Sequence, residues 1–341
     1  MGLLTQRSSR TVRFFFSQCP KYLFTSCLVM VLVTQSVTTF MSSKRKMECA
    51  LLLVLVFQST AHVSIYRHRI RVPLVVKNLA LASRMLGRIG YFANVRRRVI
   101  AQVCRSIFYM VFLVTLRLTS DNMHLLGATC ERSQTCFTTG YMAGLVAPVV
   151  MLVLLTSFVS FYSNVCAILK YLFGQLVEEL QKSDIEEEYL RLLHIYREII
   201  NVMSIVEEHF SFPVCATMLT TMGGLFRTSY VVMFQADMDY PKYFYSLITG
   251  FAYGYSLFIL IVRASEANRY AEMARDAVVR LPGVLPKHYR QLKLAIRKEF
   301  KGKTVLTFWR IYVIDRSMLL SALGTLATYG ILVATLGNVQ S

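Results

Sequence analysis

The stretch SMLLSALGTLATYGILVATLG, residues 317–337, contains no charged side chain. A helix of about 20 apolar residues crosses the ~30 Å hydrocarbon core of a bilayer, and it satisfies its backbone hydrogen bonds internally. Residues 317–337 are therefore predicted to form most of a membrane-spanning helix.

Six similar apolar blocks precede this stretch. Together the seven predicted spans are residues 22–41, 47–66, 101–119, 137–162, 210–234, 243–263 and 314–337. Of the 341 residues, 55% are hydrophobic and 17% are charged, whereas soluble domains usually have roughly 25% charged residues. The sequence therefore predicts an all-α, polytopic membrane protein, with residues 1–341 in a single seven-span domain. The first block is longer than the ~7–15 apolar residues of a signal peptide, so we expect it to be retained.

The basic residues between the spans indicate the orientation. If the N-terminus is inside, the inner segments hold 28 of the 38 Lys and Arg residues and the outer segments hold five. Because basic residues concentrate on the cytoplasmic side, we expect a cytoplasmic N-terminus and an extracellular C-terminus in the plasma membrane. The net charge of +19 then reflects topology and attraction to anionic lipid. Nucleic-acid binding, which needs a basic face on a soluble fold, is not expected.

Two long inner connections, 163–209 and 264–311, are predicted to form a cytoplasmic helical base. In the first, apolar residues recur at alternating spacings of four and three, which is typical of a heptad seam. The seam residues are Ile185, Tyr189, Leu192, Tyr196, Ile199, Met203, Val206 and Phe210. They could pack against partner helices or against the same chain. In the second connection, a helix over 264–279 is expected to break at Leu281-Pro282-Gly283 and Pro286 and to resume until about Phe300.

The last span carries hydroxyl side chains along one helical face. The candidate residues for that face are Ser317, Ser321, Thr325, Thr328 and Thr335, with Leu332 as an apolar interruption. One hypothesis is that several copies of this helix line a water-filled pore, which Leu332 narrows by dewetting. The alternative is that the hydroxyls bond to carbonyls of their own helix and the small residues between them allow tight helix packing.

The segment Ile314–Leu320, followed by Thr328 and Tyr329, resembles the last-span signature of arthropod gustatory receptors. That signature has an Asp-Arg-Ser-Leu-Leu-like segment and then Thr-Tyr, five hydrophobic residues and Gln-Phe. Asp315 and Arg316 match the first part, and Thr328 and Tyr329 match the second. Thr335 and Leu336 stand where the family has Gln and Phe. This departure leaves the gate geometry and the ion selectivity open.

The resemblance implies a ligand-gated, non-selective cation channel that is a homo- or hetero-tetramer. The last helix of each subunit would line the pore, and the cytoplasmic helices would form a central anchor. The expected function is that of a gustatory or other chemosensory receptor for a small-molecule tastant or another chemical ligand. No cofactor or metal is expected.

The resemblance also suggests a ligand pocket in the outer half of the bundle. Arg227 lies within the fifth span, where a charge costs roughly 2.5–3.5 kcal/mol and therefore usually faces protein or water. It could bind a ligand, snorkel outward, or pair with Asp237 or Asp239. The aromatic candidates for the pocket are Tyr230, Tyr243, Tyr245 and Phe251. Aromatic residues also concentrate at membrane interfaces without binding a ligand.

Cys130 and Cys136 lie in or beside the second predicted outer loop and could form a disulfide or remain free thiols. The other cysteines and the six histidines are dispersed, so no metal site is indicated.

Two other classes of protein have comparable topologies. A G-protein-coupled receptor would have an extracellular N-terminus, an Asp-Arg-Tyr after its third span and an Asn-Pro-x-x-Tyr in its last span, and this sequence has neither motif. A secondary transporter would tend to show repeated halves, which are absent from this sequence. An enzyme is not expected, because the sequence offers no carboxylate pair, no nucleophile with a base and no phosphate-binding loop.

Overall fold

The computed structural model describes residues 45–68, 71–86, 134–182, 186–234, 240–284 and 304–338. These residues form almost only helices: α2 (Arg45–His68), α3 (Val72–Met85), α5 (Gln134–Lys182), α6 (Glu186–Phe234), α7 (Tyr240–Val284) and α9 (Ser317–Asn338). Two short strands, β1 (Thr307–Phe308) and β2 (Tyr312–Val313), precede α9. The predicted all-α architecture is confirmed for this part of the chain. The predicted spans 22–41 and 101–119 lie outside it.

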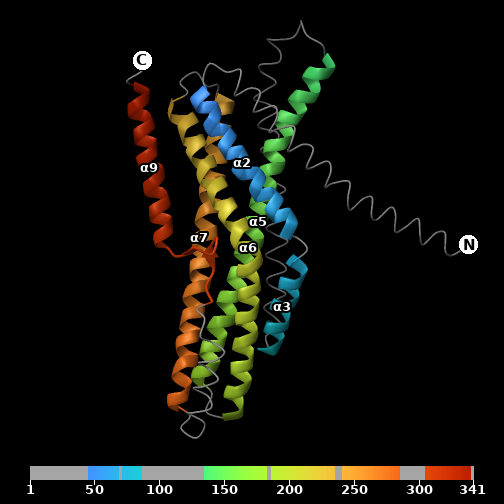
Figure 1. Cartoon of the computed structure of the whole chain (residues 1–341), viewed down its shortest axis with the longest axis vertical. Helices are drawn as coiled ribbons and strands as arrows, with labels where there is room; N and C mark the ends of the chain where they lie inside the picture. Colours follow the sequence, from blue (N-terminus) through green and yellow to red (C-terminus); the bar gives the residue numbers. More distant parts are fainter. Residues whose placement is uncertain are drawn as a thin grey trace, which may run out of the picture.

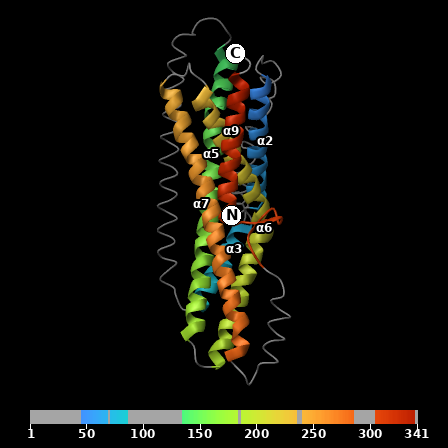
Figure 2. The same cartoon turned by 90° about the vertical axis from the view of Figure 1, so that its left-hand side faces the viewer.

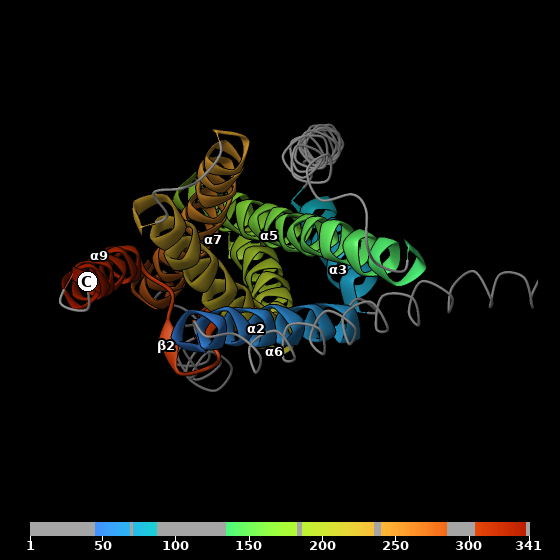
Figure 3. The same ribbon diagram turned by 90° about the horizontal axis from the view of Figure 1, so that it is seen from above.

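Helices α5, α6 and α7 are much longer than a membrane span. They contain 49, 49 and 45 residues, which at ~1.5 Å per residue makes each about 70 Å long. Each helix therefore continues a predicted span directly into the predicted base. Figure 1 shows the three helices side by side along the long axis, with α9 beside their upper half only. Viewed from above, α9 lies at one edge of the bundle and α3 at the other side (Figure 3).

The heptad seam of α6 forms the core of the lower half. Its described members are all buried: Tyr189, Leu192, Tyr196, Ile199, Met203, Val206 and Phe210. They belong to one cluster with apolar residues of α5 and with small residues of α7 at helical spacing, which include Ala264, Ala267, Ala271 and Ala274. Small side chains let helix backbones approach closely. The seam therefore packs within its own chain, which answers the question that the sequence left open.

Polar residues of α2 are also buried. Gln58, Ser59 and His62 are each less than 8% exposed, and α2 packs mainly on α6. His68, at the end of α2, lies against His209 of α6 with ring centroids 5.9 Å apart. Three of the polar residues in the second predicted span therefore face protein, whereas Thr60 is exposed and donates to the Val56 carbonyl of its own helix at 2.8 Å.

The predicted break in the second inner connection falls too early. Helix α7 continues through Leu281-Pro282-Gly283 and ends at Val284. A proline removes one backbone donor and crowds the preceding turn. This local cost is offset here because α7 packs along α5 and α6 for most of its length. Pro286 and the expected helix up to Phe300 lie outside the described residues.

The prediction that the helical base extends to residue 311 is wrong for its last residues, because residues 307–313 form a β-hairpin. Thr307 pairs with Val313 and Phe308 with Tyr312 in an antiparallel hairpin. The turn is closed by a 3.0 Å bond from the Ile311 N–H to the Phe308 carbonyl, with φ of 51° at Trp309 and 60° at Arg310. The register leaves three residues, 309–311, in the loop, and the first two have the positive φ that residues other than glycine rarely adopt.

Among the described residues, one helical segment is long and apolar enough to cross a membrane. It is Tyr243–Arg280 in α7, with a mean hydropathy of 1.6 in its most apolar part. Only 28% of that part is buried within the chain.

Candidate functional site

The beginning of α9 is held by its own acidic residue. The Asp315 carboxylate accepts a 2.6 Å bond from the Ser317 hydroxyl and a 3.1 Å bond from the Met318 N–H. A side-chain acceptor at this position satisfies a free backbone donor in the first turn, and its negative charge complements the helix dipole. Asp315, which was noted for its match to the family signature, therefore has a defined local role.

The hydroxyl face of α9 is exposed in the single chain. Ser317, Ser321, Thr325 and Thr328 are all exposed. The Thr325 hydroxyl donates to the Ser321 carbonyl and the Thr328 hydroxyl to the Gly324 carbonyl, both at 2.8 Å. Intrahelical bonding, the alternative to pore lining, therefore occurs at two of these positions. It does not exclude water, because a hydroxyl that donates once can still accept twice.

Helix α9 touches the bundle over a narrow strip. Ala322 is buried, and Met318 and Leu319 pack against the main core. Leu320 is 73% exposed and Leu323 is 48% exposed. The side chains of Tyr329, Leu332, Thr335 and Leu336 lie outside the description.

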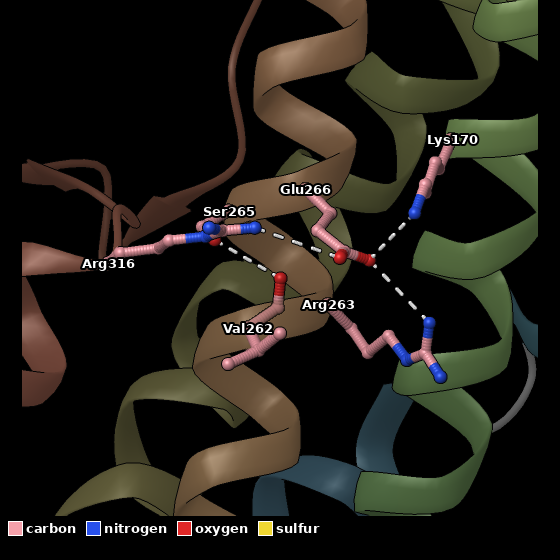
Figure 4. Close-up of polar contacts among 6 residues, drawn as sticks. All are labelled: Lys170, Val262, Arg263, Ser265, Glu266 and Arg316. Carbon is pink, nitrogen blue, oxygen red and sulfur yellow. Dashed lines mark hydrogen bonds and ion pairs between the residues drawn. The ribbon is translucent and has the colours of Figure 1, made fainter.

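A single carboxylate gathers three cations at the base of α9. Glu266 of α7 lies 3.2 Å from Lys170 Nζ of α5, 3.5 Å from Arg263 Nη1 of α7 and 3.8 Å from Arg316 Nη2. Figure 4 shows the three basic side chains converging on this carboxylate from different sides. We call these four residues the Glu266 cluster. The cluster connects α5, α7 and the segment that begins α9, and the positive charges outnumber the negative one.

A buried amide holds the hairpin that leads into α9. Asn268 Nδ2 donates to the carbonyls of Leu306 at 2.9 Å and Ile314 at 3.0 Å. Its Oδ1 accepts from the Leu306 N–H at 2.7 Å. Asn268 is 7% exposed, so both ends of the hairpin are tied to α7 by bonds that water does not weaken.

The hairpin is also bound to α6. The Glu207 carboxylate accepts from the Thr307 N–H at 2.8 Å and from the Thr307 hydroxyl. Burial raises the pKa of Glu207, and the bonds from Thr307 and the nearby Arg310 partly offset the rise. The entry to α9 is therefore connected to α5, α6 and α7 through a few polar groups. An arrangement of this kind can transmit a movement of the long helices to α9.

The outer-half pocket candidates occupy different environments. Tyr245 packs on the buried Leu152 and Leu155 of α5, together with Tyr253. Tyr243 is 41% exposed and Phe251 is 78% exposed.

On α6, Arg227 is exposed and Tyr230 is partly buried. Asp237 and Asp239 lie outside the described residues.

Tyr253 is a partly buried aromatic residue that the sequence analysis missed. It interacts electrostatically with Arg227 and Tyr245. A Cβ added to Gly224 of α6 would lie 2.6 Å from its ring. The signal was present in the spacing, because Tyr245, Thr249 and Tyr253 follow one another at four-residue intervals and so share one helical face.

The described residues hold no group of three or more His, Cys, Asp or Glu side chains that could bind a metal. Cys130 lies outside the description, and so does the Cys136 side chain. Cys166 and Cys215 are buried free thiols.

The fold resembles that of solved insect olfactory receptors. The OR5 receptor of Machilis hrabei in complex with eugenol superposes with a TM-score of 0.68 at 12% identity, covering 94% of this chain and 90% of the receptor. The structure of OR5 described without a ligand gives a TM-score of 0.62 at 13% identity, covering 93% and 89%. No family model matches the sequence, and no curated protein matches it either. The likeness extends over nearly the whole of both chains, and it concerns the all-α fold.

Proposed function

We propose that this chain is a subunit of a chemosensory, ligand-gated, non-selective cation channel in the plasma membrane, with α9 lining the pore. The observation that carries the proposal is the exposed hydroxyl face of α9, in a fold similar to that of an insect olfactory receptor. A helix that packs on its bundle by a narrow strip needs lipid or further subunits around the rest of its surface. Hydroxyl groups on that surface favour a water-filled space between subunits.

The assembly is proposed to be a homo- or hetero-tetramer with a cytoplasmic N-terminus. The charge distribution supports the orientation, and the resemblance to gustatory receptors supports the tetramer. Continuous helices from the spans into the base support a cytoplasmic anchor built from α5, α6 and α7. The seven-span division of the chain belongs to the same proposal.

The ligand is proposed to be a small molecule, and a tastant rather than an odorant. The fold neighbour was solved with eugenol, which favours small-molecule binding in general. The finer assignment to taste rests on Asp315-Arg316 and Thr328-Tyr329, which match the gustatory signature. Tyr245 and Tyr253 of α7, with Arg227 of α6, are the proposed pocket residues.

The proposed mechanism of opening follows the contacts at the base of α9. A ligand between the outer halves of α5, α6 and α7 would displace α7. Glu266 and Asn268 would carry that displacement to α9, because α7 bears both residues.

A substituted-cysteine experiment tests the pore. Ser321→Cys and Thr325→Cys lie on the hydroxyl face, and Leu323→Cys lies on a different face of the same helix and is also exposed. In cells that express the chain alone, a charged water-soluble thiol reagent should change the ligand-evoked current through the first two variants. It should not change the current through Leu323→Cys or the wild type. Equal modification at all three positions would contradict a pore-lining role for the hydroxyl face.

Two further measurements separate the alternatives. Current that persists with G-protein signalling blocked excludes a G-protein-coupled receptor, and current without coupled substrate uptake excludes a secondary transporter.

Arg227→Met tests the proposed pocket, because an unchanged ligand response in this variant would show that Arg227 does not contribute to ligand binding.

A further inference from the structure

The hairpin before α9 exposes an unusual group of side chains. Trp309 is 54% exposed, Ile311 is 67% exposed and Tyr312 is 68% exposed. Val313 is 47% exposed and Arg310 is also exposed. We call residues 309–313 the hairpin tip. Figure 2 shows the hairpin projecting sideways from the bundle at the level where α9 begins.

The tip is held firmly although it is exposed. Asn268 and Glu207 bind the backbone at its base, and the Trp309 ring meets Phe212 of α6 edge to face, with centroids 5.8 Å apart. Exposed apolar side chains on a loosely held loop could fold back onto the protein. These side chains are instead presented outward by a fixed backbone.

The backbone conformation at the tip is costly for the residues that occupy it. Trp309 and Arg310 both have positive φ, a conformation usually occupied by Gly, Asn or Asp because most side chains are disfavoured there. Strain of this kind is a reason to look for a function of the side chains themselves. A tryptophan beside an arginine at the tip is therefore a specific feature.

Two predicted spans place the tip at the inner membrane boundary. It directly precedes the last span, and the residue that Trp309 contacts, Phe212, lies at the start of the fifth span, 210–234. The placement at this depth rests on the orientation in the proposed function. Tryptophan and tyrosine concentrate where hydrocarbon meets headgroups, and arginine is attracted to the anionic lipids of the cytoplasmic leaflet.

The charge of the segment also suits an anionic surface. Arg310 and Arg316 are exposed, and Arg316 also lies 3.8 Å from Glu266. The only acidic residue between 304 and 316 is Asp315, which is bonded to Ser317 and Met318. We propose that the hairpin tip is a membrane-surface anchor, with Trp309, Ile311 and Tyr312 inserted among the lipid headgroups of the cytoplasmic leaflet and Arg310 against their phosphates. The anchor holds the base of α9 at a constant depth.

The chain provides its own probe for this proposal. Trp309 is the only tryptophan among the 341 residues, so intrinsic tryptophan fluorescence reports on the hairpin tip alone. The purified full chain is reconstituted into vesicles of phosphatidylcholine, with and without phosphatidylserine. Some lipids carry bromine either near the headgroup or near the end of the acyl chain, and bromine quenches tryptophan that it touches. Acrylamide in the water is the complementary quencher, and Trp309→Phe gives the background.

Quenching is expected to be strong with bromine near the headgroups and weak with bromine at the chain ends or with acrylamide. Arg310→Gln is expected to reduce the effect of phosphatidylserine on this pattern, whereas Arg280→Gln, at the far end of α7, is not. Strong quenching by acrylamide alone would place the tip in water and overturn the proposal. Protection from every quencher would mean that protein covers the tip, most simply a second copy of the chain, and would overturn it too. The measurement uses no ligand and no current, so its outcome is independent of the channel assay.

Discussion

Replacing Glu266 with glutamine tests whether the base of α9 is coupled to the long helices by charge. The substitution keeps the shape of the side chain and removes the negative charge that faces Lys170, Arg263 and Arg316. Those three cations then remain close together without compensation. Both the free energy of unfolding and the equilibrium between closed and open states of the proposed channel should change.

The magnitude follows from the exposure of each partner. The Glu266 side chain is 19% exposed, Lys170 is 32% exposed, Arg263 is 43% exposed and Arg316 is 65% exposed. Pairs of this kind contribute from ~0 to 1 kcal/mol each, with the more exposed pair at the lower end. We expect Glu266→Gln to lower the free energy of unfolding by about 1 kcal/mol, mostly through Lys170, the least exposed of the three partners. The pair with Arg316 contributes a few tenths of a kcal/mol, which is roughly a twofold change in an equilibrium constant.

The assay combines thermal unfolding of the purified chain with ligand concentration–response curves. Glu208→Gln, at an exposed position of α6, is the control for loss of a carboxylate and should change both less. Arg316→Gln should shift the half-maximal ligand concentration about twofold in the wild type and not in the Glu266→Gln background, because the partner is then already absent. If Arg316→Gln has the same effect in both backgrounds, the two residues act independently and the proposed coupling is wrong.

Three other substitutions test the remaining contacts. Asn268→Ala should lower the free energy of unfolding by about 2–3 kcal/mol, because buried backbone groups of Leu306 and Ile314 lose their partner. The control Asn164→Ala, at a half-buried site bonded to Ser160, should lower it less in the same unfolding assay. Equal losses in the two variants would contradict the argument. The pKa of His68 lies below 6.5 because of burial and then the charges of His209, Arg67 and Arg71, so the folded state binds the proton less well than the unfolded state. The contribution of His68 to the free energy of unfolding should be present above pH 6.5 and fall as the pH drops through the lowered pKa. Thermal unfolding across this range should depend less on pH in His68→Gln than in the wild type. An unchanged pH dependence would be inconsistent with the assignment to His68. Gly224→Ala should destabilise the fold by about 1–3 kcal/mol and weaken the ligand response, because its Cβ would meet the Tyr253 ring. The control Gly254→Ala, whose Cβ would lie 3.9 Å from Leu225, should be tolerated in the same two assays, and an equally tolerated Gly224→Ala would argue against the close approach.

The features that the sequence predicted well depend on regular repetition. The heptad seam from Tyr189 to Phe210 was recognisable because a helix places residues three and four apart on one face, and those residues are buried. The base was predictable as helical for the same reason. The end of α7 at Val284 was predicted a few residues too early, because Pro282 and Gly283 suggested a break before it.

The hairpin was missed because its causes are distant in the sequence. Trp309-Arg310 is not a sequence that predicts a turn. The groups that hold the hairpin, Glu207 and Asn268, lie 100 and 38 residues before the backbone that they bind. Local patterns do not reveal such contacts.

The pocket candidates were only partly informative for a related reason. Each was chosen for its depth in a predicted span, and depth does not determine which way a side chain faces. Phe251 and Tyr243 face away from the bundle, whereas Tyr253, two residues beyond Phe251, packs inside.

The continuity of α5, α6 and α7 also limits how this chain can change in length. Each residue in a helix turns the chain by about 100°. One residue inserted between the outer and inner halves of α7 would rotate Ala264, Ala267, Ala271 and Ala274 out of the main core while leaving the outer half in place. We therefore expect insertions and deletions among relatives of this chain to avoid these three helices and to concentrate in the segments between them.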